Sequence, residues 1–217
     1  MTKFEANANT MEVAAYFDRP GPYFLNRPLV VLLEGLGVEY NTLKYYQDIA
    51  IQKADEAMIS LEVAAEVLEE HGLGASLRLP SALVSLTKLG IYELPHDEFF
   101  KRAMVDAKIH ILRLLKHHAR IPIPGAWTLV GVADVHRYLK PGEIFAFVRP
   151  TDGRPSIYLK GRVLISRSPT IHPGDVQIAH AIGPPPPGSC FEQEPLANTV
   201  VFSVLGQLAP SLLYAHT

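Results

Sequence analysis

The sequence predicts an α+β protein in which helices come first and strands follow. Apolar residues recur every three or four positions through much of segment 26–120, which is the spacing of a buried helix face. From about residue 121, short apolar segments alternate with turn clusters such as Lys140-Pro-Gly142 and His172-Pro-Gly-Asp175. Several short strands at this spacing are typical of a barrel or a sandwich.

Composition and charge limit the class of protein to which the chain can belong. The chain has 217 residues, of which 48% are hydrophobic and 19% are charged, so it can bury a core as one domain or two small ones. Stand-alone nucleic-acid binders often have a basic pI. Here the net charge is −2 and the pI is near 6.5, so any RNA contact must be local.

Two features bear on the compartment. The strongest apolar run, 28–38, is too short to cross a bilayer and contains Glu34, so no membrane partner is expected. The single cysteine, Cys190, permits no internal disulfide and favours a reducing compartment, either the cytoplasm or the nucleus.

The first half predicts a strand at 10–17, a turn at 18–22, and then helices at 26–37, 41–68, 81–89 and 97–120. Asn26 is a suitable N-cap for the first helix, because Pro28 falls in the first turn, where a missing N–H does no harm. The second helix would contain about 28 residues and be roughly 42 Å long. Gly72 and Gly74 follow it as stop signals.

The second half predicts strands at 127–134, 144–148, 162–166, 176–182 and 199–204. No partner strand follows the last one. We therefore expect an open β-domain, and the tail 206–217 suggests a truncated chain.

Five sets of residues could carry chemistry. Arg167, His172 and Asp175 share a turn between two predicted strands, where they could converge on a ligand. The alternative is a Pro-Gly turn in which Asp175 bonds its own backbone. Asp134 ends an apolar strand and either points into a site or, as we favour, caps a turn.

The other three sets have plainer alternatives. Arg113, Lys116 and Arg120 would share a helix face that holds a phosphate backbone, or simply a solvated face. Glu192 and Glu194 would share a strand face and hold Mg²⁺, or lie in an exposed loop. Cys190 would be a nucleophile only with a base nearby, and no local motif supplies one.

Eight segments form a recognisable series along the chain: Met1-Thr-Lys-Phe4, Tyr23-Phe-Leu-Asn-Arg-Pro-Leu29, Leu33-Glu-Gly-Leu-Gly-Val38, Ala119-Arg-Ile-Pro-Ile-Pro124, Gly131-Val-Ala-Asp134, Leu139-Lys-Pro-Gly-Glu-Ile-Phe145, Gly161-Arg-Val-Leu-Ile-Ser-Arg-Ser-Pro-Thr-Ile-His-Pro-Gly-Asp175 and Thr199-Val-Val-Phe-Ser203. In this order they resemble the eukaryotic cellular RNA-dependent RNA polymerases of RNA silencing, and the fungal members most closely. The resemblance extends from Met1 to about Gly206, although the family prefers Asn at the position of Ser168.

The resemblance implies two double-psi β-barrels joined by helices. Residues 1–25 would be the tail of the first barrel, 26–120 the helical connector, 121–204 the opening part of the second barrel, and 205–217 a divergent tail. The implied activity is template-directed nucleotidyl transfer, in which single-stranded RNA and nucleoside triphosphates give complementary RNA with the assistance of Mg²⁺. By the same resemblance, Lys3 and Arg167 would lie near substrate phosphates, and His172 and Asp175 would shape the adjacent loop.

One departure from the family is severe. The family continues with Gly-Gly-Asp-Leu-Asp-Gly-Asp, whose aspartates hold Mg²⁺, whereas this chain contains no Asp-x-Asp. We therefore expect this polypeptide to hold no Mg²⁺ and to be inactive alone. The alternatives are a non-catalytic RNA-binding fragment, a non-functional truncated product, and an unrelated hydrolase that uses Cys190 with His172.

Overall fold

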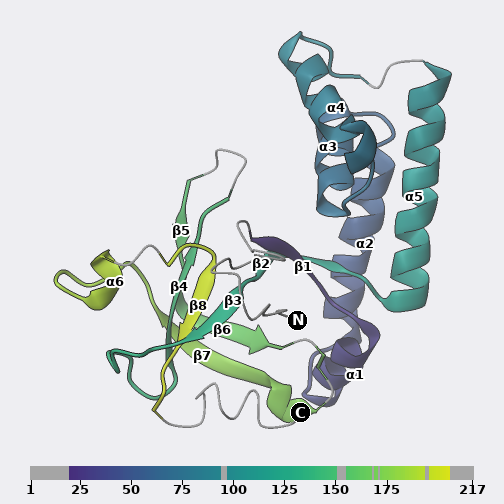
Figure 1. The fold of residues 1–217 in the computed structure, drawn as a ribbon. Coiled ribbons are helices and arrows are strands. Elements are labelled where there is room, and N and C mark those ends of the chain that lie inside the picture. The colour runs from purple at the N-terminus through teal and green to yellow at the C-terminus, as the bar shows by residue number, and fades with distance from the viewer. Residues whose placement is uncertain are drawn as a thin grey trace, which may run out of the picture. The chain divides into compact units, whose positions relative to one another are not determined.

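The computed structural model describes residues 20–93, 97–150, 155–167, 169–170, 172–193 and 196–205. The chain divides into two compact units. The helical unit comprises 22–126 and 169–173, and the sheet unit comprises the remaining segments, 1–21, 127–168 and 174–217. Figure 1 shows both units, with the five longer helices in one and most of the strands in the other. The predicted α+β class is therefore confirmed.

The helical unit contains α1 (Arg27–Gly35), α2 (Tyr40–Glu56), α3 (Leu61–Glu70), α4 (Leu79–Lys88) and α5 (Glu98–His118). The predicted cap Asn26 is confirmed, and Asp97 caps α5 in the same way. The Asn26 side chain accepts a hydrogen bond from Leu29 N at 2.9 Å, and the Asp97 side chain accepts one from Phe99 N at 2.8 Å. Each satisfies a backbone donor that the first helical turn leaves unpaired.

The prediction of one helix over 41–68 is wrong, because α2 ends at Glu56 and α3 begins at Leu61. Ser60 lies at the break as the N-cap of α3, and its hydroxyl accepts a hydrogen bond from Val63 N. Leu61 N donates to Tyr92 O at 3.0 Å instead of continuing the helical ladder. A contact distant in sequence therefore stabilises a break that the apolar spacing conceals.

The core of the helical unit lies between packed helix faces. Helix α2 packs against both α3 and α5, and α3 packs against α4. Fully buried side chains at these contacts include Leu61, Leu68, Leu83, Met104 and Ile111. Strands β1 (Gly21–Phe24) and β2 (Pro122–Thr128) form a two-stranded sheet. No helix among the described residues is long and apolar enough to cross a membrane.

The sheet unit contains β3 (Val130–Ala133), β4 (Glu143–Val148), β5 (Ile157–Tyr158), β6 (Lys160–Ser166), β7 (Val176–Ile182), β8 (Thr199–Phe202) and the short helix α6 (Cys190–Gln193). The order is β3-β8-β4-β7-β6, and β5 pairs with β4. Pairs β3/β8 and β4/β7 are parallel, whereas β4/β8 and β6/β7 are antiparallel. Over the described strands, this path is open, ending at β3 and at β6.

Four predicted strands correspond to β4, β6, β7 and β8, but the predicted strand 127–134 is two strands. Its first part belongs to β2, which pairs with β1, and its second part is β3, which pairs with β8. The two parts join different sheets, so the chain cannot continue as one strand across Leu129. The predicted strand 10–17 lies outside the described residues.

Strand β4 lies at the centre of the sheet and contributes to two clusters. Ile144 and Ala146 pack with Ala179, Ala181 and Phe202. Phe145 lies in a second cluster with Leu139, Phe191 and Val201. Because successive side chains of a strand point to opposite faces, β4 is covered by apolar groups on both faces.

Candidate functional site

An ion pair joins the two strands of the β6/β7 hairpin just beyond their last paired residues. Ser166 and Val176 are register partners, so the next residues outward, Arg167 and Asp175, face each other. Arg167 Nε donates to Asp175 Oδ1 at 2.9 Å. Both side chains are largely covered, with 25% and 12% of their surface exposed. The guanidinium is thus held at a defined position at the end of the sheet.

Besides Arg167, the predicted site comprises Asp175, His172 and Lys3, of which Asp175 lies in a turn. Asp175 closes a short 3₁₀ turn, Pro173–Asp175, and Gln177 Nε2 donates to Gly174 O at 3.1 Å beside it. His172 is exposed and belongs to the helical unit, with segment 169–173. Lys3 lies outside the described residues. The structure therefore brings Arg167 and Asp175 together.

Asp134 caps a turn, as favoured from the sequence. It is 1% exposed, and its Oδ2 accepts a hydrogen bond from Leu139 N at 2.7 Å. Its own backbone N–H donates to Phe202 O at 2.8 Å, which ties the end of β3 to β8. The other carboxylate oxygen, Oδ1, is buried without a hydrogen-bond partner.

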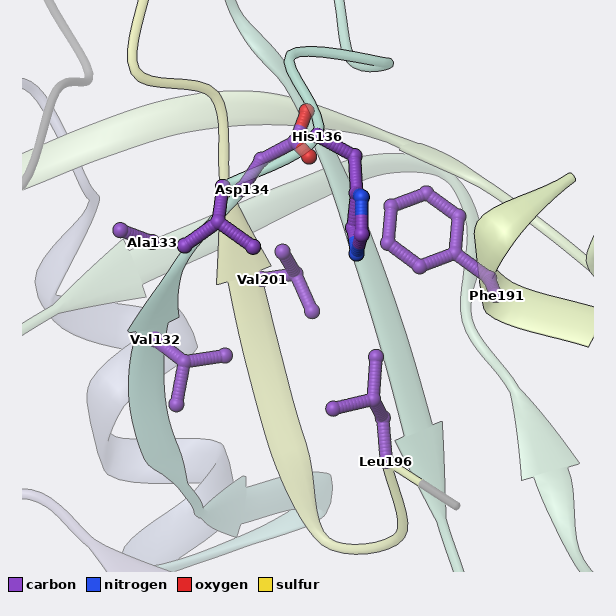
Figure 2. Close-up of a pocket in the computed structure, with 8 residues that line it drawn as sticks. Val132, Ala133, Asp134, His136, Phe191, Leu196 and Val201 are labelled. Atoms are coloured by element: carbon purple, nitrogen blue, oxygen red, sulfur yellow. The ribbon is translucent and has the colours of Figure 1, made fainter. Parts of the chain in front are cut away.

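A small pocket of about 30 Å³ lies beside Asp134. Figure 2 shows Val132, Leu196 and Val201 along its wall and the His136 imidazole turned toward Phe191. A volume of this size matches about one water molecule. The pocket is therefore too small for a nucleotide and suits solvent beside a buried carboxylate.

The predicted basic face is only partly formed. Arg113 and Lys116 lie exposed on α5, but the helix ends at His118. The C-cap, Ala119, has φ 50° in the left-handed region and turns the chain away. The Arg120 guanidinium accordingly lies 4.3 Å from the centre of the Phe24 ring, so it does not continue the helix face.

Near that contact lies a buried histidine. The His71 ring is 5.3 Å from the Phe24 ring, and its Nδ1 is buried without a hydrogen-bond partner. Burial lowers the pKa of His71 below 6.5, and the nearby cations Arg120 and Lys53 lower it further against the opposing effect of Glu70. The neutral form is therefore favoured.

The hypothesis that Glu192 and Glu194 form a metal-binding pair on one strand face is wrong for Glu192, the one of the two that the structure describes. Glu192 lies in helix α6, where residues two apart do not share a face. Its Oε2 accepts a hydrogen bond from Gly188 N at 2.7 Å, so it stabilises the preceding turn. Glu194 lies outside the described residues. Cys190, at the start of α6, is partly buried against the Phe145 cluster, as a small apolar residue would be.

Among the residues that the structure describes, the donor set does not fit the Mg²⁺ that the resemblance implies. Over the described ranges, no group of three or more His, Cys, Asp or Glu side chains could hold a metal ion. Asp134, Asp175 and Glu192 instead accept hydrogen bonds from protein donors. A two-metal site needs several carboxylates that converge on one point, and these three support different turns.

Sequence reasoning missed a larger pocket of about 280 Å³, here called the aromatic pocket. Its aromatic wall comprises Phe145, Phe147, Tyr158 and Phe191, and its polar groups include Arg149 and Gln193. A weak signal was present, because Phe145 and Phe147 are two apart and share one strand face. Tyr158 and Phe191 are too far away in sequence for any local pattern to join them.

Comparison with known proteins bears on the whole chain. A family model described as RNA dependent RNA polymerase matches residues 1–213. A probable RNA-dependent RNA polymerase 1 of Oryza sativa subsp. japonica is 30% identical over 188 residues, which are 85% of this chain and 24% of that protein. RNA-dependent RNA polymerase 1 of Schizosaccharomyces pombe is 26% identical over 223 residues, which are 94% of this chain and 17% of that protein.

The fold is also similar to a solved structure. The RNA dependent RNA polymerase QDE-1 from Thielavia terrestris superposes with a TM-score of 0.62 at 16% identity, over 90% of this chain and 23% of that one. The chain thus spans about a quarter or less of the length of these relatives. Because the family model covers nearly every residue, the chain belongs to the RNA dependent RNA polymerase family.

Proposed function

We propose that this chain is a core segment of an RNA-directed RNA polymerase that makes complementary RNA from a single-stranded template and nucleoside triphosphates. The observation that carries the proposal is the family match over residues 1–213. The resemblance to the silencing enzymes extends the proposal to RNA-mediated gene silencing. The single cysteine supports a place in the cytoplasm or the nucleus.

The architecture proposed for the whole enzyme has two double-psi barrels. In this chain, 1–25 would end the first barrel, 26–120 would connect the barrels, 121–204 would open the second, and 205–217 would be a divergent tail. The mixed sheet supports this assignment, since β3/β8 and β4/β7 are parallel pairs between antiparallel ones. Parallel neighbours require crossover connections, which a simple meander lacks.

Within that enzyme, Arg167 is the residue proposed to contact a substrate phosphate. Asp175 holds its Nε, so the planar guanidinium meets an anion with little loss of side-chain entropy. Asp175 is therefore a positioning residue. His172 in the same turn and Lys3 are assigned to phosphate or RNA contacts by the resemblance.

The aspartates that bind metal in the family motif have no counterpart in the sequence, which contains no Asp-x-Asp. In the proposed enzyme, those carboxylates come from outside these 217 residues. We accordingly expect the polypeptide alone to synthesise no RNA.

The test uses a full-length relative in which the arginine aligned with Arg167 is replaced. Arg167→Ala should reduce RNA synthesis on a single-stranded template about 10- to 100-fold, the size of one lost charge-assisted contact. Arg167→Lys should recover part of the rate, because it restores the charge without the planar fork. Arg162→Ala on the exposed part of β6 is the matched control. Wild-type rates in Arg167→Ala would remove this residue from the site.

A further inference from the structure

The aromatic pocket is built from segments that are distant in sequence. Strand β4 contributes Phe145 and Phe147, β5 contributes Tyr158, and α6 contributes Phe191. The volume of about 280 Å³ is near the lower end of the range of small-molecule pockets. It suits one planar ring system and is too small to take a helix.

Two stacked pairs set the geometry of the wall. Phe147 and Tyr158 stack with centroids 4.6 Å apart and an interplanar angle of 19°. Phe145 and Phe191 stack at 4.6 Å and 3°. Phe145 and Phe191 are buried, whereas Tyr158 is 38% exposed. Part of an aromatic surface, already fixed by a stacked neighbour, is therefore open to solvent.

A cation stands beside the stacked rings. The Arg149 guanidinium lies 5.5 Å from the centre of the Phe147 ring, and Arg149 is exposed. The backbone beneath it is fixed, because Arg149 N donates to the buried Asn198 Oδ1 at 2.8 Å. Aromatic rings with an adjacent arginine form the usual stacking platform for single-stranded nucleic acid.

Pro185 helps to form another wall of the pocket. The exposed Lys160 packs over Gly183, two residues before Pro185. A Cβ on Gly183 would lie 3.3 Å from Lys160 Cγ and Cδ. The acid that lines the pocket, Glu192, already accepts a hydrogen bond from Gly188 N. The charged and amide groups that line the aromatic pocket are thus the Arg149 guanidinium, the Glu192 carboxylate and the Gln193 amide.

We propose that the aromatic pocket holds one nucleobase of a single-stranded RNA, stacked on the exposed surface of Tyr158, which Phe147 supports from behind, while Arg149 contacts the adjoining phosphate. This inference rests on the proposed function, because it assigns an RNA-binding site to the proposed polymerase segment. It also meets the constraint of the net charge of −2, because it requires basic groups only around one pocket.

The test is fluorescence anisotropy of the full chain with a labelled twelve-nucleotide oligoadenylate, compared with an abasic strand of the same length. Tyr158→Leu and Phe147→Leu should each weaken binding by at least about 5-fold, since stacking contributes roughly 1–3 kcal/mol per base. Arg149→Gln should weaken binding and lower the salt slope by about one. Two matched controls, Tyr45→Leu on α2 and Arg162→Gln on β6, should bind as the wild type does.

A second measurement needs no substitution. Photo-crosslinking of a 4-thiouridine strand to the wild-type chain should label the peptides that contain Phe147 and Tyr158. Equal affinities for the base-bearing and abasic strands, or wild-type affinity in Tyr158→Leu, would overturn the inference. Competition by free AMP as strong as by the strand would also overturn it in favour of a mononucleotide.

Failure of this inference is distinguishable from failure of the proposed function. If the pocket variants bind RNA as the wild type does, only the base-binding role of the pocket is rejected. The rates of Arg167→Ala in a full-length relative still test the polymerase assignment. If Arg167→Ala synthesises RNA normally while Tyr158→Leu loses RNA binding, Arg167 is excluded from the phosphate site and the pocket remains the proposed base-binding site.

Discussion

Asp134→Ala tests whether the buried carboxylate is the cap that organises the turn after β3. Asp134 is 1% exposed, and its Oδ2 accepts from Leu139 N at 2.7 Å. Leu139 is itself 1% exposed and packs with Phe145, Phe191 and Val201. Alanine removes the acceptor and leaves the Leu139 N–H without its protein partner.

Two opposing effects set the magnitude. A buried donor left without a partner costs roughly 1–3 kcal/mol, and a hydrogen bond to a charged group contributes about 1.5–3 kcal/mol. Against this, Oδ1 of Asp134 is buried without a partner, so alanine also removes a poorly solvated oxygen. We expect a net loss of about 2 kcal/mol in the free energy of unfolding of the sheet unit.

The assay combines urea unfolding with amide hydrogen exchange of Leu139. Asp134→Ala should lower the unfolding midpoint and remove most of the protection at that amide. Asp134→Asn keeps an oxygen for Leu139 N, so its stability should stay within about 1 kcal/mol of the wild type. Unchanged exchange at Leu139 together with an unchanged midpoint in Asp134→Ala would refute the capping role.

Three further predictions concern the helical unit. Asn26→Ala should destabilise it by about 1 kcal/mol through loss of the N-cap bond to Leu29 N, and wild-type thermal melting by circular dichroism would contradict this. Ala119→Gly should stabilise it by roughly 0.5–1 kcal/mol, because φ is 50° there; a lower urea midpoint would be the contrary result. For His71, the folded pKa is lowered, so the unfolded state binds the proton first and stability falls as the pH drops below about 6.5. His71→Phe should reduce that fall between pH 7 and pH 5.5 in urea titrations, and an identical pH dependence would exclude His71 as its source.

Local signals were sufficient for much of the fold. Asn26 was predicted as a cap because the first turn of a helix leaves backbone donors that its side chain can reach. Strand β7 was predicted with its observed bounds, Val176–Ile182, since turn residues flank an apolar segment. The hairpin register then places Arg167 opposite Asp175, so this pair was within reach of the sequence.

The errors arose where distant contacts decide the structure. The apolar spacing continues across 57–60, but the bond from Leu61 N to Tyr92 O and the bridge between Ser60 and Glu93 interrupt the helix. Likewise, the left-handed turn at Ala119 moves Arg120 off the predicted basic face. The aromatic pocket depends on Tyr158 and Phe191 reaching β4, and only the sheet topology and the position of α6 bring them there.

The acidic residues of the sheet unit show why its carboxylates support turns. Each of the four that are described accepts a hydrogen bond close to a change of chain direction: Asp134 from Leu139 N, Glu143 from Lys140 N, Asp175 from Arg167 Nε, and Glu192 from Gly188 N. A metal site would require several carboxylates to converge on one point, and these four lie at separate changes of chain direction. These acids therefore hold the ends of β3, β4 and β7 and the start of α6 in place. Among the groups they position is the Arg167 guanidinium, which is proposed to contact a substrate phosphate.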